Sequence, residues 1–160
     1  PVGAKGTTAY VMLEIHYDNP TFKGGITDNS GLKIIMTSTL RKYDAGVIEL
    51  GLEYTDKMAI PPLQEKFELT GHCIAECTSV ALPFDGIWIF ASQLHTHLTG
   101  VKVETVLVRN GAEILRVDRD NHYSPHYQEI RLLRHRVYVF PGNALYTRCT
   151  YDTMTRKEIT

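Results

Sequence analysis

Hydrophobic residues recur along the chain in short, strand-length runs that are rich in Val, Ile, Tyr and Thr. The runs include YVMLEIHY, LKIIMTSTL, GVIELGLEY, GIWIFASQLHTHL, VKVETVLVR and RVYVF. Turn-forming pairs such as Asp85-Gly86 and Asn110-Gly111 lie between them. Short β-prone runs separated by such turns predict an antiparallel all-β sandwich. Because Asn and Gly both tolerate positive φ, the Asn110-Gly111 pair also predicts a tight type I′ hairpin between VETVLVR and AEILRV.

Alternation along residues 88–98 divides the run GIWIFASQLHTHL into two faces. The even positions are mostly apolar and are expected to pack on the core; they are Trp88, Phe90, Ser92, Leu94, Thr96 and Leu98. The opposite face then carries His95 and His97 side by side, next to Gln93. Two neighbouring imidazoles are able to bind one metal ion, and copper, zinc and iron all suit this donor. The alternative is that both are polar residues of a half-exposed strand.

The other histidines carry weaker signals. His16 lies on the polar face of YVMLEIHY and, taken alone, is typical of a solvent-exposed strand position. His122 and His126 have the spacing of a helical metal pair, but Pro125 disfavours a helix there, so we expect loop histidines. The remaining two are His72 and His135, and neither carries a stronger signal.

Composition excludes several classes of protein. The 160 residues fit one domain, or one domain with part of a neighbour, and 17 basic against 18 acidic side chains give a net charge of -1. This balance favours neither nucleic acid nor an anionic membrane as a partner. No run of about 18 apolar residues predicts a membrane span. The first residues, PVGAKGTTAY, lack the apolar core of a signal peptide, so a secreted protein would carry its signal upstream.

The cysteines indicate the redox compartment of the protein, and the composition between two predicted strands indicates a domain boundary. Cys73, Cys77 and Cys149 form an odd set, so either the chain is cytosolic or disulfide partners are missing. The C-x3-C spacing of the first two is compatible with zinc, but no second cysteine pair follows, and disulfides are favoured. Gly, Asn, Asp and Pro crowd residues 18–31, where a domain boundary is expected. Phosphate-loop, serine-hydrolase and zinc-protease motifs are absent from the sequence.

Several longer stretches resemble one enzyme family. They are LEIHYDNP, LRKYDAGVIELGLEYT, MAIPP, ALPFDGI, FASQLHTHLTG, RDNHYSPHYQEIR and PGNALYTRCTYDT. Their order and spacing are similar to those of the ascorbate-dependent, type II copper monooxygenases, and above all to the branch that hydroxylates phenylethylamines such as dopamine and tyramine. The resemblance covers essentially the whole chain. It implies two consecutive jelly-roll-like β-sandwich domains, each of which binds one copper.

The resemblance assigns roles to three histidines. It implies that His95 and His97 bind the hydroxylating copper of the second domain. It also implies that His16 is the last of three histidine ligands of the electron-transfer copper, whose other two form an adjacent pair upstream. The family's methionine ligand directly precedes a cysteine, which is not true of Met154, so Met154 is not assigned.

The resemblance also implies a domain organisation and a cellular context. Residues 1–19 would end the first copper domain, residues 20–30 would be a linker, and residues 31–160 would form the catalytic domain without its C-terminal part. The three cysteines match family positions whose disulfide partners lie downstream. A secreted, disulfide-bonded glycoprotein of the secretory vesicle lumen or extracellular space is expected. The resemblance leaves membrane association and homo-oligomerisation of the full-length protein open.

Gln93 bears on the choice between branches of the family. The peptide-amidating relatives carry an Arg at this position to hold a peptide carboxylate, and the neutral Gln93 lacks that charge. The sequence therefore predicts a monooxygenase that uses copper, ascorbate and O2 to hydroxylate the benzylic carbon of a phenylethylamine in catecholamine biosynthesis. The alternatives are a non-catalytic metal-binding β-sandwich and a peptidylglycine α-hydroxylating monooxygenase.

Overall fold

The computed structural model describes residues 10–52 and 55–160. The chain divides into two compact units, Pro1–Val47 and Ile48–Thr160. The segment PVGAKGTTAY, which bears on the signal-peptide prediction, lies outside the described residues except for Tyr10. The domain limits expected from the sequence, at residues 19 and 30, stay predictions.

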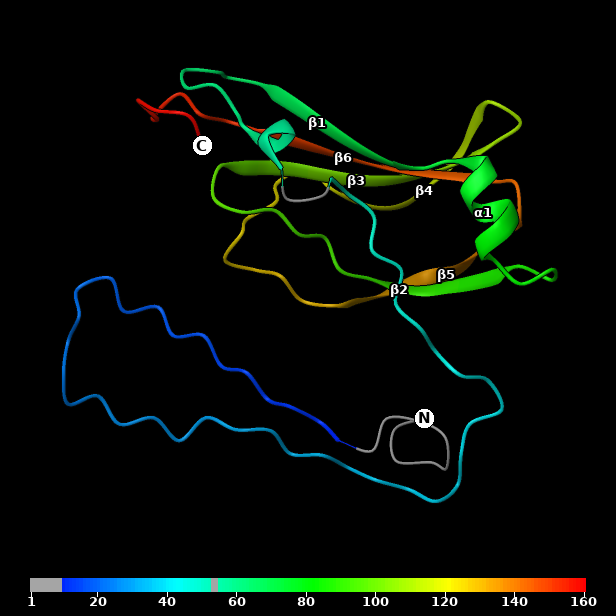
Figure 1. Cartoon of the computed structure of the whole chain (residues 1–160), viewed down its shortest axis with the longest axis horizontal. Helices are drawn as coiled ribbons and strands as arrows, with labels where there is room; N and C mark the ends of the chain where they lie inside the picture. Colours follow the sequence, from blue (N-terminus) through cyan, green and yellow to red (C-terminus); the bar gives the residue numbers. More distant parts are fainter. Residues whose placement is uncertain (1–9, 53–54) are drawn as a thin grey trace. The chain divides into compact units, whose positions relative to one another are not determined.

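The second unit is built from antiparallel strands. In chain order its elements are η1 (Asp56–Met58), β1 (Phe67–Cys73), α1 (Ala75–Ala81), β2 (Ile87–Ser92), β3 (Gly100–Arg109), β4 (Ala112–Asp120), β5 (Arg131–Val139) and β6 (Ala144–Tyr151). One sheet has the order β1-β6-β3-β4 and the other pairs β2 with β5 (Figure 1). Every strand pairing is antiparallel, which confirms the predicted all-β class. The jelly-roll connectivity stays a prediction.

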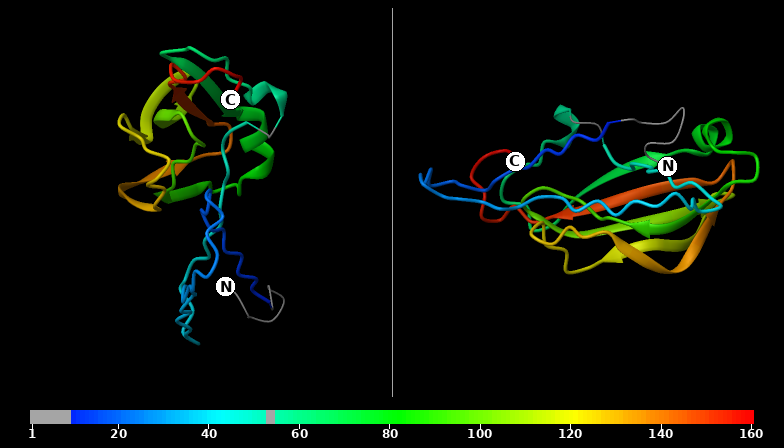
Figure 2. Two further views of the ribbon diagram at one scale, coloured as in Figure 1. Left: turned by 90° about the vertical axis from the view of Figure 1, so that its left-hand side faces the viewer. Right: turned by 90° about the horizontal axis from the view of Figure 1, so that it is seen from below.

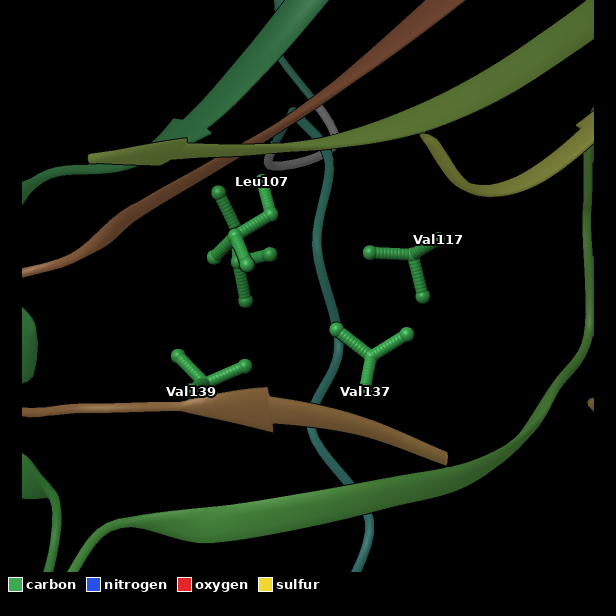
Figure 3. Close-up of a cluster of buried hydrophobic side chains, with 5 residues drawn as sticks. Leu107, Val117, Val137 and Val139 are labelled. Carbon is green, nitrogen blue, oxygen red and sulfur yellow. The ribbon is translucent and has the colours of Figure 1, made fainter. Parts of the chain in front are cut away.

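The two sheets face each other across the core. Leu107 of β3 and Val117 of β4 point toward Val137 and Val139 of β5 (Figure 3). Leu145 of β6 completes this cluster, and all five side chains are buried. Removing a Val or Leu side chain of this kind from water contributes about 1.5–3 kcal/mol each. The apolar positions of VKVETVLVR and RVYVF therefore specify how the two layers pack.

The helix α1 is attached to the turn between β5 and β6. The hydroxyl of Thr78, which is buried, donates to the carbonyl oxygen of Asn143 at 2.6 Å and accepts the amide hydrogen of Gly142 at 3.0 Å. The helix and the C-terminus lie at opposite ends of the second unit, as Figure 1 and the right-hand view of Figure 2 show. No helix in the described part of the chain is long and apolar enough to cross a membrane.

The Asn110-Gly111 hairpin is confirmed. These two residues connect β3 to β4 and have positive φ, 52° for Asn110 and 76° for Gly111. A type I′ turn requires this conformation at both central residues, and Gly adopts it without the steric cost that a Cβ brings. Local sequence chemistry therefore determines this connection.

The core face predicted for residues 88–98 is correct for Leu94 and Thr96, which are buried, and wrong for Trp88, Phe90 and Leu98, which are exposed. Strand β2 ends at Ser92, and its pairing with β5 shifts register between Ile89 and Ala91. Before this irregularity Ile87 and Ile89 pack on the core, whereas Trp88 is 58% exposed. Across the register shift β5 has three more residues than β2, and the odd-numbered side chains of β2 stay the less exposed ones as far as Ala91. The faces reverse only where the strand ends, before the buried Leu94. Regular alternation did not anticipate this reversal.

Two strands predicted in the first unit, and a third that begins at Gly46 and continues into the second unit, are not formed in the described residues. YVMLEIHY and LKIIMTSTL have no strand assignment, nor do residues 46–52 of GVIELGLEY; Glu53 and Tyr54 lie outside the described residues. Apolar side chains of both alternating faces are exposed, for example Met12 at 85% and Leu13 at 53%. A strand needs a neighbour for its backbone hydrogen bonds and a surface for its apolar face. The described residues of this unit supply neither, so β propensity alone did not suffice.

Candidate metal centre

The candidate metal centre is a loop that follows β2 at the end of the second unit opposite α1. Residues 93–99 leave the two-stranded sheet and enter β3 at Gly100, next to the loop of residues 121–130 between β4 and β5 (Figure 1). Within the first loop Leu94 and Thr96 are buried, while His95 and His97 are exposed. The prediction that the two imidazoles share one exposed face is therefore confirmed.

The two imidazole rings lie close enough to share an ion. Their centroids are 5.1 Å apart and the ring planes are perpendicular. A metal–imidazole bond is about 2.0 Å, so two rings on one ion have centroids roughly 5–6 Å apart. The described residues contain no group of three or more His, Cys, Asp or Glu side chains able to hold a metal. In donor chemistry the pair fits copper, and it provides two ligands of a centre that ordinarily has three from protein.

The buried phenol of Tyr123 fixes the backbone between the two histidines. Its hydroxyl accepts the amide hydrogen of Thr96 at 2.9 Å and donates to the carbonyl oxygen of Thr96 at 3.4 Å. The amide of Tyr123 donates to the carbonyl of Val101 at 3.0 Å. Leu94 and Val103 pack against the Tyr123 ring in a second hydrophobic cluster. The histidine loop is therefore anchored on its inner side by side chains from β3 and from the neighbouring loop.

Gly100 allows the loop to turn tightly into β3. A Cβ at this position would lie 1.9 Å from Oγ1 of Thr96 and 2.7 Å from its Cβ. The amide of Gly100 donates to the carbonyl of His97 at 3.3 Å. Only a residue without a side chain fits this close approach. The small residue that ends LHTHLTG thus has a structural role in presenting the histidines.

Gln128 contacts the histidine loop from its other side. Its Oε1 is hydrogen-bonded to Nδ1 of His95, and its backbone carbonyl accepts from Nε2 of Gln93 at 2.6 Å. Sequence analysis assigned no role to Gln128 or Tyr123, although both belong to DNHYSPHYQEI. No spacing rule relates them to His95, because the contact arises from two loops that are brought together by the strands. Tertiary structure was needed to find them.

The other histidines do not join this centre. His122 and His126 are exposed in a non-helical loop, as predicted, and their amides donate to Asp120 and Ser124. His16 belongs to the first unit, where it is exposed and its Nε2 lies 2.5 Å from Oε1 of Glu14. His72 and His135 are exposed positions of β1 and β5. The ligand roles assigned to His16, His95 and His97 stay predictions.

Burial makes two of the three cysteine thiols weaker metal ligands. All three are free thiols in the structure. Burial, followed by the hydrogen bond with Cys77, raises the pKa of the Cys73 thiol, and burial raises the pKa of Cys149. A thiol must lose its proton to bind zinc or copper, so these two are poor ligands at neutral pH. Their pairing with downstream cysteines stays a prediction.

Comparison with known proteins shows the family of this chain. Residues 43–160 match the copper type II ascorbate-dependent monooxygenase, C-terminal domain. Dopamine beta-hydroxylase of Canis lupus familiaris is 56% identical over 158 residues, which cover 99% of this chain and 25% of the relative. Tyramine beta-hydroxylase of Caenorhabditis briggsae is 49% identical over 160 residues, which cover 100% of this chain and 27% of the relative. Human DBH-like monooxygenase protein 1 is 42% identical over 154 residues, or 94% of this chain and 25% of the relative.

The chain spans about a quarter of the length of these curated relatives. The family match covers all six strands of the second unit, including the loop that carries His95 and His97. The identity extends over nearly the whole chain and includes both units. The chain belongs to the copper type II, ascorbate-dependent monooxygenases.

Proposed function

We propose that His95 and His97 bind the hydroxylating copper of a monooxygenase whose substrate is a phenylethylamine such as dopamine or tyramine. The observation that carries the proposal is the pair of exposed imidazoles with centroids 5.1 Å apart, on a loop that the buried residues Leu94 and Thr96 anchor. Copper bound there supplies the redox chemistry that inserts one oxygen atom from O2 into a C–H bond. Ascorbate is the proposed electron donor, in accordance with the family description.

In this proposal the protein chain binds the ion on one side and leaves its other side accessible to solvent and substrate. His95 and His97 are exposed, so their rings face solvent and an approaching substrate. Leu94 and Thr96 are buried beneath them, and Tyr123 holds the intervening amide. The two ligands therefore project from a rigid base while the outer side of the ion stays accessible, which a catalytic metal requires.

Gln93 supports an amine substrate over a peptide. Its side chain is exposed two residues before His95 and donates to the carbonyl of Gln128 at 2.6 Å. A neutral amide at this position does not provide the charge-assisted hydrogen bonds that an arginine offers to a carboxylate. The identities to a dopamine and to a tyramine beta-hydroxylase support the same choice. The product is a β-hydroxylated amine, as in catecholamine biosynthesis.

His16 is proposed as a ligand of the second, electron-transfer copper. It lies in the first unit, exposed and hydrogen-bonded to Glu14. The proposal rests on the family resemblance of LEIHYDNP. We further propose a disulfide-bonded glycoprotein of the secretory vesicle lumen or the extracellular space.

Turnover by the full-length protein tests the function. Copper-reconstituted protein is assayed with tyramine and with dopamine in the presence of ascorbate and O2. We expect β-hydroxylation, and a loss of more than about 100-fold in His95→Ala, because loss of a ligand costs more than loss of a group that only supports one. The matched control is His122→Ala, an exposed loop histidine that should keep wild-type turnover.

The same assay separates the alternatives. Turnover of a glycine-extended peptide, with none of either amine, would support the peptidylglycine α-hydroxylating branch. Absence of turnover with all three substrates would support a non-catalytic metal-binding β-sandwich. Equal activity of His95→Ala and wild type would refute the assigned role of His95.

A further inference from the structure

Gln128 makes three hydrogen bonds, of which two connect its loop to the histidine loop and one stays within its own loop. Its side-chain Oε1 is hydrogen-bonded to Nδ1 of His95. Its side-chain Nε2 donates to the backbone carbonyl of Pro125 at 2.5 Å. Its own backbone carbonyl accepts from Nε2 of Gln93 at 2.6 Å. The side chain is partly buried, and both ends of its amide are therefore engaged.

The contact with Pro125 determines which way the amide of Gln128 faces. A backbone carbonyl oxygen is only an acceptor, so the atom opposite it must be the NH2 group of Gln128. The Oε1 atom then has to face His95. An amide oxygen is also only an acceptor, so Nδ1 of His95 must carry a hydrogen to bond with it. In a neutral imidazole this leaves the lone pair on Nε2.

We propose that Gln128 is a positioning residue that holds His95 as the Nδ1–H tautomer and so presents Nε2 to the metal. A ligating histidine commonly donates its other ring N–H to a carbonyl or carboxylate, which fixes the tautomer and the ring orientation. Gln128 provides this acceptor for His95. The consequence for copper rests on the proposed function, whereas the tautomer is a property of the metal-free protein.

Within the described residues, the hydrogen bonding of the two candidate ligands is unequal. The ring of His95 is bonded to Gln128, while the ring of His97 contacts His95 edge to face and has no hydrogen-bond partner there. Loss of the Gln128 amide should therefore release the His95 ring first. The same substitution removes the hydrogen bond to the Pro125 carbonyl, which fixes the orientation of the Gln128 amide in wild type.

Nuclear magnetic resonance of the metal-free, full-length protein tests the tautomer directly. Histidine labelled with 15N reports whether each ring carries its hydrogen on Nδ1 or Nε2, and His95→Gln assigns the signal of His95. We expect the Nδ1–H form of His95 in wild type and a mixture of both tautomers in Gln128→Leu. An Nε2–H form in wild type would overturn the proposal, whether or not the variant folds.

Competition with a Cu(I) chelator then measures the effect on metal affinity. Gln128→Leu should weaken copper binding at this centre by about 10–100-fold, the usual effect of removing such a support. Gln128→Glu keeps an acceptor for Nδ1–H but loses the donor to Pro125, so it should weaken copper binding less than Gln128→Leu does. The matched control is Glu129→Gln, an exposed neighbour that pairs with Arg131 instead of the histidine loop.

The two measurements distinguish failure of this inference from failure of the proposed function. If His95 is the Nδ1–H tautomer in wild type and loses that preference in Gln128→Leu, the positioning role stands even when no copper binds at this centre. If Gln128→Leu keeps both the tautomer and the copper affinity of wild type, Gln128 has no positioning role. That result would leave the proposed function intact.

Discussion

At the scale of single residues, the candidate centre depends on side chains that are not themselves proposed to bind the metal. Tyr123 is 6% exposed and satisfies both the amide and the carbonyl of Thr96, the residue between the two histidines. Backbone groups of a loop that is buried away from water need such partners. The precision with which His95 and His97 are presented therefore depends on the Tyr123 hydroxyl.

Replacing Tyr123 with Phe tests this dependence. The variant keeps the buried ring but leaves the Thr96 amide without its acceptor, so we expect a loss of about 1–3 kcal/mol in the free energy of unfolding. Urea denaturation of the full-length protein measures it. Tyr127→Phe is the control, since Tyr127 is 74% exposed and should change stability by less than about 0.5 kcal/mol. Equal stability of the two variants would show that the Thr96 contact is dispensable.

At the scale of elements, the sequence predicted those features that local chemistry determines. The Asn110-Gly111 turn and the strands around it were predicted, because positive φ and alternating apolar residues act within one hairpin. The inward orientation of Ile87 and Ile89, instead of Trp88, was not predicted. Which face of a strand packs on the core depends on the surface that it meets, and a single run of residues does not encode that surface.

The turn from the histidine loop into β3 makes a second prediction. In Gly100→Ala the new Cβ would overlap Thr96, whose side chain is β-branched, buried and unable to move freely. We expect a loss of about 1–3 kcal/mol in stability and weaker copper binding, because relief of the overlap displaces the loop. Thermal unfolding and chelator competition measure the two effects. Gly46→Ala is the control, as its Cβ would meet no atom within 4 Å; wild-type copper affinity in Gly100→Ala would contradict the account.

The four-stranded sheet carries an ion cluster around one buried carboxylate, which joins three of its strands. Glu104 of β3, with its side chain 3% exposed, lies 3.1 Å from Arg116 of β4 and 3.1 Å from Arg148 of β6. Glu104→Gln removes the charge that compensates these guanidinium groups, and we expect a loss of about 1.5–3 kcal/mol in the free energy of unfolding.

The exposed pair of Glu68 with Lys66 provides the comparison for that variant. Its atoms are also 3.1 Å apart, but the side chains are 36% and 68% exposed. Solvent screens such a pair, so Glu68→Gln should cost at most about 1 kcal/mol. Denaturant titration of both variants measures the difference. If Glu68→Gln proved as costly as Glu104→Gln, burial of Glu104 would not explain its contribution.

At the scale of the whole molecule, the two units differ in how far sequence predicts them. The second unit has a core between two sheets, and its all-β class followed from the pattern of runs and turns. In the first unit the runs YVMLEIHY and LKIIMTSTL have strand composition without strand structure. Their exposed apolar side chains show the physical reason, since a strand is stable only when another surface covers it.

The site divides in the same way between what the sequence predicts and what it does not. Alternation placed His95 and His97 on one exposed face, and the family resemblance is the basis for proposing copper as their ion. The contacts of Gln128 and Tyr123 join residues that are 33 and 27 positions apart from their partners. Such contacts depend on how the loops between strands pack together. Neither the hydrophobic periodicity of the sequence nor its secondary-structure propensity encodes them.

Copper content of the full-length protein tests the central claim most directly. The double variant His95→Ala/His97→Ala is reconstituted beside wild type and the control His122→Ala/His126→Ala, and copper per chain is measured by mass spectrometry after removal of unbound metal. The account predicts that the first variant binds one copper fewer per chain, while the control binds as much as wild type. Wild-type copper content in His95→Ala/His97→Ala would contradict it.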